Sequence, residues 1–163
     1  MKYGIYYAYW EKEWNGDYKY YIDKISKLGF DILEISCGAF SDYYTKDQEL
    51  IDIGKYAKEK GVTLTAGYGP HFNESLSSSE PNTQKQAISF WKETLRKLKL
   101  MDIHIVGGAL YGYWPVDYSK PFDKKRDLEN SIKNMKIISQ YAEEYDIMMG
   151  MEVLNRFEGY MLN

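Results

Sequence analysis

The chain has 163 residues, of which 44% are hydrophobic, 17% aromatic and 28% charged. This composition excludes a disordered chain, and the length suits one domain but is too short for a complete (β/α)8 barrel of about 250 residues. The formal net charge of −3 comes from 21 basic and 24 acidic residues mixed along the sequence, which argues against nucleic acid as a partner because its binding needs a concentrated basic face.

Short runs of strand-forming residues alternate with segments of helical periodicity. The expected strands cover residues 3–9, 31–37, 62–69, 103–108 and 147–154. Between them, apolar residues recur at three- and four-residue spacing, which predicts helices over residues 18–28, 45–60, 81–101 and 128–145. The apolar stripe expected to be buried on the last helix consists of Leu128, Ile132, Met135, Ile138, Ala142 and Tyr145.

The sequence also predicts where the first two helices begin and end. Gly29 and Gly61 follow the last periodic residues and are expected to end these helices. Thr45 and Gln48 have the spacing of a capping box, which predicts the start of the second helix.

Strict alternation of strands and helices predicts a parallel sheet with right-handed crossovers. Two architectures suit this order: a doubly wound open sheet, and a (β/α) barrel cut after its fifth strand. In the second expected strand, Leu33 and Ile35 share one face, whereas Glu34 and Ser36 share the other. A doubly wound sheet is apolar on both faces, so this pattern favours the barrel. We therefore predict an α/β fold in which residues 1–163 form one partial domain, the N-terminal portion of a (β/α)8 TIM barrel with about four and a half βα units.

The single cysteine, Cys37, excludes an internal disulfide and is typical of a reducing compartment. The sequence starts without a signal-peptide pattern, and its longest mostly apolar stretch, residues 103–116, is too short to span a membrane. We therefore expect a cytoplasmic protein with no membrane partner.

Glu152 is the strongest candidate for chemistry, because it is a carboxylate within an otherwise apolar expected strand. A lone buried carboxylate is costly unless it is paired or binds a metal, and catalytic residues lie at the C-terminal ends of barrel strands. The structural alternative is an ion pair with Arg156. Glu34 lies earlier in its strand, where a structural role is favoured, and Glu158 follows in a loop, where local sequence favours a solvated charge.

Aromatic residues also gather where strands end. Tyr6, Trp14 and Trp114 lie in such segments, and there they can line a sugar pocket or serve only to pack the loops. His71 and His104 do not have the spacing of a metal-binding motif.

Four segments of the chain carry a family resemblance. They are Gly4–Trp10, Leu33–Ile35, Gly107–Tyr111 and, most specifically, Glu152–Glu158, which reads EVLNRFE. With them the whole chain resembles the ketose 3-epimerases, the D-tagatose and D-psicose (allulose) 3-epimerases of the xylose-isomerase-like barrel superfamily. The resemblance implies a (β/α)8 barrel that interconverts ketohexoses at C3 (D-fructose/D-psicose or D-tagatose/D-sorbose) through an enediolate. It also implies a divalent metal, Mn²⁺ or Co²⁺ with Mg²⁺ as a further candidate, at the mouth of the barrel.

The resemblance assigns roles residue by residue. Glu152 resembles a catalytic glutamate that is also a metal ligand, and Glu158 resembles a glutamate that hydrogen-bonds the sugar hydroxyls. Tyr6, Trp14 and Trp114 match aromatic positions that line the substrate pocket. The other metal ligands of the family, an Asp, a His and a second Glu, lie on later strands that this sequence does not include.

We therefore expect a ketohexose substrate and, for the full-length form, a homodimer or homotetramer. The chain alone is expected to be inactive, and to be unstable or self-associated through unpaired strand edges. Two alternatives remain open: another sugar isomerase of the xylose/hydroxypyruvate isomerase-like superfamily, and a non-catalytic half-barrel. The apurinic-endonuclease branch is disfavoured, because it needs a histidine-rich metal site and a basic face, whereas this chain has two histidines and a net charge of −3.

Overall fold

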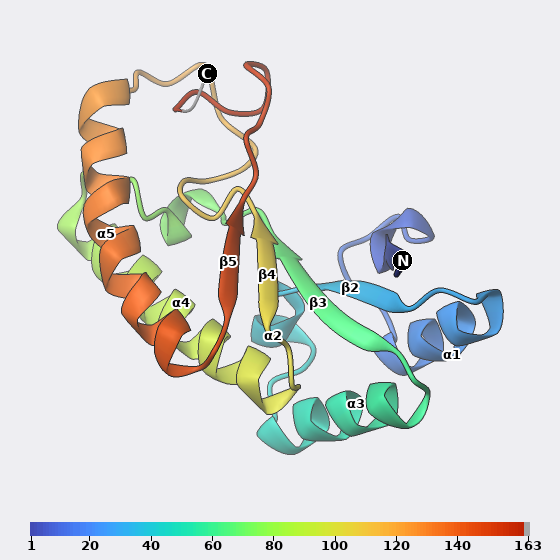
Figure 1. Ribbon diagram of the computed structural model, residues 1–163. Coiled ribbons are helices and arrows are strands. Elements are labelled where there is room, and N and C mark those ends of the chain that lie inside the picture. Colours follow the sequence, from blue (N-terminus) through green and yellow to red (C-terminus); the bar gives the residue numbers. More distant parts are fainter. Residues whose placement is uncertain (162–163) are drawn as a thin grey trace. The chain divides into compact units, whose positions relative to one another are not determined.

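The computed structural model describes residues 1–161, apart from the side chain of Asp42. Strands and helices alternate along the chain (Figure 1). The strands are β1 (Gly4–Tyr6), β2 (Ile32–Ser36), β3 (Thr63–Tyr68), β4 (Ile105–Gly108) and β5 (Met148–Met151). The helices are α1 (Tyr18–Leu28), α2 (Ala39–Asp42), α3 (Asp47–Glu59), α4 (Pro81–Leu100) and α5 (Lys124–Glu144), with short 3-10 turns η1 (Tyr7–Tyr9) and η2 (Phe72–Glu74).

The five strands form one parallel sheet in the order β1-β2-β3-β4-β5. Leu33 of β2 pairs with Ile5 of β1 on one side and with Leu64 of β3 on the other. A doubly wound sheet reverses its strand order at a switch point, whereas a barrel adds each strand beside the last. The sequential order therefore confirms the first five strands of a barrel and excludes the doubly wound alternative.

The chain separates into two compact units. The first comprises Met1–Gly67 with Arg96–Val106, and the second comprises Tyr68–Leu95 with Gly107–Asn163. In the described part of the chain, no helix combines the length and the apolar character needed to cross a membrane.

In the first unit, α1 forms where the periodicity predicts it. Tyr18, Ile22 and Ile25 are fully buried, and the Asp17 side chain accepts a hydrogen bond from the backbone N–H of Tyr20, which caps the helix. Gly29 ends the helix with φ 81°, a left-handed conformation that glycine adopts without strain. The predicted end of this helix is confirmed.

The capping box predicted for the second helix is wrong. Helix α3 begins at Asp47, and its N-cap is Lys46, whose side chain makes no capping hydrogen bond. The side chains of the first turn make other contacts: Gln48 donates to Asp52 at 2.8 Å, and the Asp47 carboxylate accepts two hydrogen bonds from Arg96, at 2.7 and 2.8 Å. A carboxylate in the first turn also stabilises the positive end of the helix dipole.

The first and last strands are shorter than predicted. Strand β1 ends at Tyr6 because Tyr7, which is fully buried, turns the chain and donates its hydroxyl to the carbonyl of Trp14 at 2.7 Å. Strand β5 ends at Met151, one residue before Glu152.

In the second unit, the predicted buried stripe of α5 is confirmed in part, because Ile138 and Ala142 are buried but polar residues share the buried face with them. The buried residues of α5 are Asp127, Ser131, Asn134, Ile138 and Ala142. Ile132, which belongs to the predicted buried stripe, is 49% exposed. Polar side chains enter the interior because the carbonyl groups of neighbouring loops need hydrogen-bond partners there.

Candidate active site at the ends of the strands

Glu152 directly follows β5 in the second unit. Its backbone N–H donates to the carbonyl of Gly108, the last residue of β4, at 2.9 Å. Its side chain is exposed, so the expectation of a carboxylate buried within a strand is wrong. Within residues 1–161 this carboxylate has no hydrogen-bond or ion-pair partner, and Arg156 instead lies over the ring of Phe157 at 5.0 Å. The structural alternative, a pair with Arg156, is not formed.

A glycine is required at the end of β4. Gly108 has φ 125°, and a Cβ atom there would lie 2.2 Å from the carbonyl oxygen of Tyr68. Any side chain would therefore displace the backbone that pairs with Glu152.

Tyr111 lies beside Glu152 and was not predicted as a site residue. Burial raises the pKa of its hydroxyl, and the negative charge of Glu152 raises it further, while a hydrogen bond with the backbone of Leu154 opposes the shift. The hydroxyl therefore stays protonated next to the carboxylate. The sequence placed Tyr111 at the end of Gly107–Tyr111, one of the segments that carry the family resemblance, but assigned it no role.

Glu158 is exposed on a loop that hydrogen bonds hold at one point before it and at one point after it. Within the loop, Asn155 donates its side-chain amide to the Glu158 carboxylate. Before Glu158, the Tyr118 hydroxyl donates to the carbonyl of Arg156 at 2.7 Å. After it, the buried Tyr160 donates its hydroxyl to Asp127 at 2.9 Å. The loop therefore holds Glu158 in place without burying its carboxylate.

The buried polar residues of α5 also form hydrogen bonds with the other loops of the second unit. The Ser131 hydroxyl donates to the carbonyl of Tyr111 at 2.6 Å, and the Asn134 amide donates to the carbonyl of Leu76 at 2.8 Å. With Asp127, these residues hold the segments that follow β3, β4 and β5. Sequence reasoning missed this role because only the apolar residues of the helix were assigned to its buried face.

Trp114 packs against the loop that follows β3. Its backbone N–H donates to the carbonyl of Pro70 at 2.8 Å. A Cβ atom on Gly69 would lie 3.1 Å from the Cβ of Trp114, so glycine lets the tryptophan approach the backbone. The second unit thus carries Trp114, Glu152 and Glu158 on the segments that follow β4 and β5.

The first unit brings Tyr6 and Trp14 together, with ring centroids 6.4 Å apart. Burial raises the pKa of Tyr6 to about 12, a hydrogen bond with Ser36 opposes the shift, and the charge of Glu34 adds to it. The phenol is therefore neutral near pH 7. Gly67 leaves room for Glu34, because a Cβ atom there would lie 2.9 Å from its Oε1. Sequence reasoning identified both aromatic residues but not Ser36 as the partner of Tyr6.

Residues 1–161 contain no group of three or more His, Cys, Asp or Glu side chains that could hold a metal ion. Glu152 can offer one carboxylate, which is too few ligands for a protein metal site. The described residues therefore do not fit a divalent metal by themselves.

The sequential order of the five parallel strands is that of a (β/α)8 barrel. The family model for the xylose isomerase-like TIM barrel matches residues 22–163, and the chain belongs to this family.

Two curated relatives are D-psicose 3-epimerases. The chain is 57% identical to the protein of Enterocloster bolteae and 47% identical to that of Ruminiclostridium cellulolyticum, in each case over its whole length. It spans only 54% and 55% of those relatives, so about half the length of the curated proteins it matches. The solved structure of D-psicose 3-epimerase with D-tagatose from Clostridium cellulolyticum H10 has a TM-score of 0.96 and 47% identity, covering 100% of this chain and 56% of that one.

Proposed function

We propose that the chain forms the N-terminal half of a ketose 3-epimerase, an enzyme that inverts the configuration of a ketohexose at C3. The observation that carries the proposal is the exposed carboxylate of Glu152 directly after β5, without a partner in the described residues. The identity of 57% to a D-psicose 3-epimerase over the whole chain supports it.

In the proposed reaction, the carboxylate of Glu152 accepts the proton from C3 of an open-chain ketose. The electron pair of the broken C–H bond forms the C2–C3 double bond of an enediolate, and negative charge moves to the oxygen on C2. Return of a proton to the opposite face of C3 completes the inversion. The acid for that step is assigned to residues beyond 1–161, so we propose that the chain alone does not turn over its substrate.

The remaining candidate residues would bind the sugar. Glu158 would accept hydrogen bonds from sugar hydroxyls, since its carboxylate is exposed on a loop fastened on both sides. Tyr6, Trp14 and Trp114 would line the pocket with aromatic faces. Tyr6, being neutral, can offer its hydroxyl as well as its ring.

We also propose that Glu152 is one ligand of a divalent metal, Mn²⁺ or Co²⁺, whose other ligands come from residues outside the described chain. A bound metal would stabilise the negative oxygen of the enediolate. The proposed assembly of the full-length form is a homodimer or homotetramer.

The proposal is tested in a fusion of this chain to the part of the Enterocloster bolteae relative that it does not match. We expect the fusion with added Mn²⁺ to exchange the C3 hydrogen of D-psicose for solvent deuterium, and the 163-residue chain alone not to do so. Glu152→Gln should lower the exchange rate by about 10²–10⁴-fold, the usual contribution of a general base. The matched control is Glu129→Gln, since Glu129 is an exposed carboxylate on α5.

Retention of most of the exchange by the Glu152→Gln fusion would refute the assignment of the base. Aldose–ketose interconversion without exchange at C3 would favour another sugar isomerase of the superfamily. A folded fusion with neither reaction would favour a non-catalytic barrel.

A further inference from the structure

The loop that carries Trp14 is held by tyrosine hydroxyl groups. Residues 10–17 form neither helix nor strand, so their backbone groups need hydrogen-bond partners from elsewhere. The Tyr7 hydroxyl donates to the carbonyl of Trp14 at 2.7 Å. The Tyr44 hydroxyl donates to the carbonyl of Gly16 at 2.8 Å. Two phenols that are far apart in the sequence therefore hold the loop on either side of residue 15.

The segment that follows β2 supplies Tyr44 together with its neighbour Tyr43. The backbone N–H groups of both residues donate to the carbonyl of Ala39, at 2.9 and 3.0 Å, which fixes the segment against α2. The Tyr43 hydroxyl accepts a hydrogen bond from the side-chain amide of Asn15 at 2.8 Å. Each of the three successive residues 14–16 is thus bonded to a tyrosine hydroxyl.

The two donating phenols are themselves fixed by Tyr18 of α1. The ring of Tyr44 stacks on the ring of Tyr18 with centroids 4.8 Å apart, and the Tyr44 hydroxyl accepts a hydrogen bond from the backbone N–H of Tyr18 at 3.2 Å. The buried ring of Tyr7 meets the same ring edge-on at 5.3 Å. A Cβ atom on Gly16 would lie 3.0 Å from the Tyr7 ring, so glycine lets the loop approach it. Burial raises the pKa of both phenols, so both remain proton donors near pH 7.

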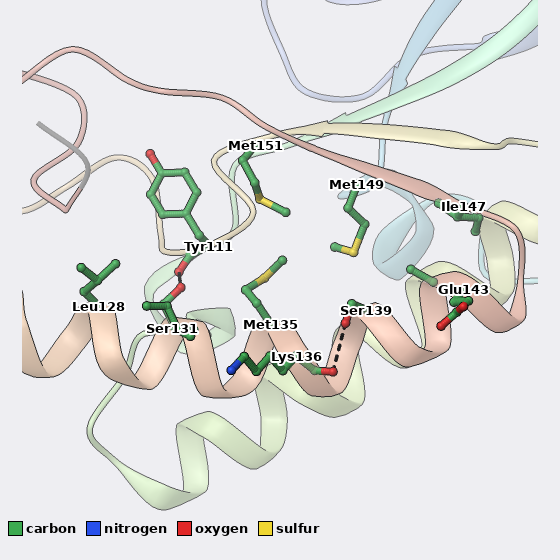
Figure 2. A pocket seen from close by; sticks show the side chains of 12 residues that line it. Tyr111, Leu128, Ser131, Met135, Lys136, Ser139, Glu143, Ile147, Met149 and Met151 are labelled. Carbon is green, nitrogen blue, oxygen red and sulfur yellow. Dashed lines mark hydrogen bonds between the residues drawn. The ribbon is translucent and has the colours of Figure 1, made fainter.

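The second unit holds a site loop in a different way. There the hydroxyl of Ser131, on the long helix α5, donates to the carbonyl of Tyr111 (Figure 2). In the first unit the donors lie instead in the segments that follow β1 and β2. The carboxyl ends of parallel strands meet at one edge of a sheet, which is where a barrel places its active site. The phenols that hold the Trp14 loop therefore belong to the surroundings of the candidate site itself.

We propose that Tyr7 and Tyr44 are positioning residues, whose hydroxyl groups keep the ring of Trp14 beside that of Tyr6 in the conformation that binds the sugar. Trp14 is 60% exposed, and its ring centroid lies 6.4 Å from that of Tyr6. A loop that is already held in its binding conformation avoids the cost of ordering it when the ligand binds. The inference rests on the proposed function, in which Trp14 lines the ketohexose site.

The first test measures the C3 exchange of D-psicose in the fusion of this chain to the unmatched part of the Enterocloster bolteae relative. Tyr44→Phe keeps the ring and removes the hydroxyl. It should raise KM about 3–10-fold and leave kcat within about twofold, because a neutral hydrogen bond shifts an equilibrium by about that factor and the reacting groups are unchanged. Tyr7→Phe should act in the same way. The matched control is Tyr56→Phe, because the Tyr56 hydroxyl donates to Asp23 at 2.8 Å and joins α3 to α1; it should leave KM unchanged.

The second test separates positioning from a general loss of stability. In the fusion labelled with 5-fluorotryptophan, the fluorine signal of Trp14 is identified by its loss in Trp14→Phe. This signal should shift or broaden in Tyr44→Phe but not in Tyr56→Phe. In a Trp14→Ala background, Tyr44→Phe should cause no further rise in KM, because the effects of residues that act through one another are not additive.

Three outcomes would overturn the inference: equal rises in KM for Tyr44→Phe and Tyr56→Phe, a fall in kcat without a rise in KM for Tyr44→Phe, or a further rise in KM when Tyr44→Phe is added to Trp14→Ala. An inactive fusion would contradict the proposed function. The fluorine signal then decides the positioning role alone, since an unchanged Trp14 signal in Tyr44→Phe and Tyr7→Phe means that the hydroxyl groups do not hold the ring.

Discussion

Strands β2 and β5 both carry large apolar side chains, but these differ in exposure. Leu33 and Ile35 of β2, which pairs with β1 and β3, are fully buried. Met148 and Met151 of β5, which lies at the end of the sheet order, are 68% and 40% exposed. The difference shows that an apolar strand is buried by the elements that flank it, and its own composition does not decide the outcome.

The largest expected effect is on the free energy of unfolding, and it differs between a substitution in β2 and one in β5. Ile35→Ala should lower the free energy of unfolding by about 2–5 kcal/mol, because it leaves a cavity in a closely packed core. Met151→Ala should cost less than about 1 kcal/mol, since much of that side chain already contacts water. Urea unfolding of the chain followed by circular dichroism measures both.

If Ile35→Ala and Met151→Ala lowered the free energy of unfolding equally, the difference in exposure between β2 and β5 would be contradicted, since Met151 would then be buried in solution. Light scattering at two protein concentrations would show whether self-association buries it.

The second prediction separates stability from binding in the segment after β5. Glu158→Gln in the fusion should weaken sugar binding by about 10–150-fold, because a hydrogen bond to a charged group contributes about 1.5–3 kcal/mol. The melting temperature should stay the same, since the carboxylate is exposed. Calorimetric titration with D-psicose and with Mn²⁺ measures the two affinities. A collapse of the Mn²⁺ affinity would make Glu158 a metal ligand and refute its assigned role.

The smallest expected effect is on stability, and it concerns the hydrogen bonds that hold the loop of Glu158. Tyr160→Phe removes the hydroxyl that donates to the buried Asp127, and it should cost about 1 kcal/mol of stability. Tyr118→Phe is the matched control, because its hydroxyl donates to the carbonyl of Arg156 at an exposed position, and its cost should be smaller. Thermal unfolding of the chain compares the two. A cost for Tyr118→Phe as large as that for Tyr160→Phe would mean that burial does not set the strength of these contacts.

The candidate residues were selected where the signal is local or carried by a motif. Glu152 was selected as a lone carboxylate in an apolar expected strand, and Glu158 was selected through the motif EVLNRFE. The aromatic residues Tyr6, Trp14 and Trp114 were selected through their places near strand ends together with the family resemblance. Tyr111 and Ser36 were missed, because their nearness to Glu152 and Tyr6 arises only when different strands align. The roles of the predicted residues stay predictions.

The sequence by itself determined the order of the strands and of the longer helices, the end of α1 at Gly29 and the barrel-type faces of β2. These features depend on periodicity and on the conformational freedom of single residues, which act over a few positions. Only the tertiary structure decided that polar residues share the buried face of α5 with Ile138 and Ala142. Asp127, Ser131 and Asn134 enter the interior because loops distant in sequence present a hydroxyl and carbonyl oxygens there, and a buried polar group needs a partner.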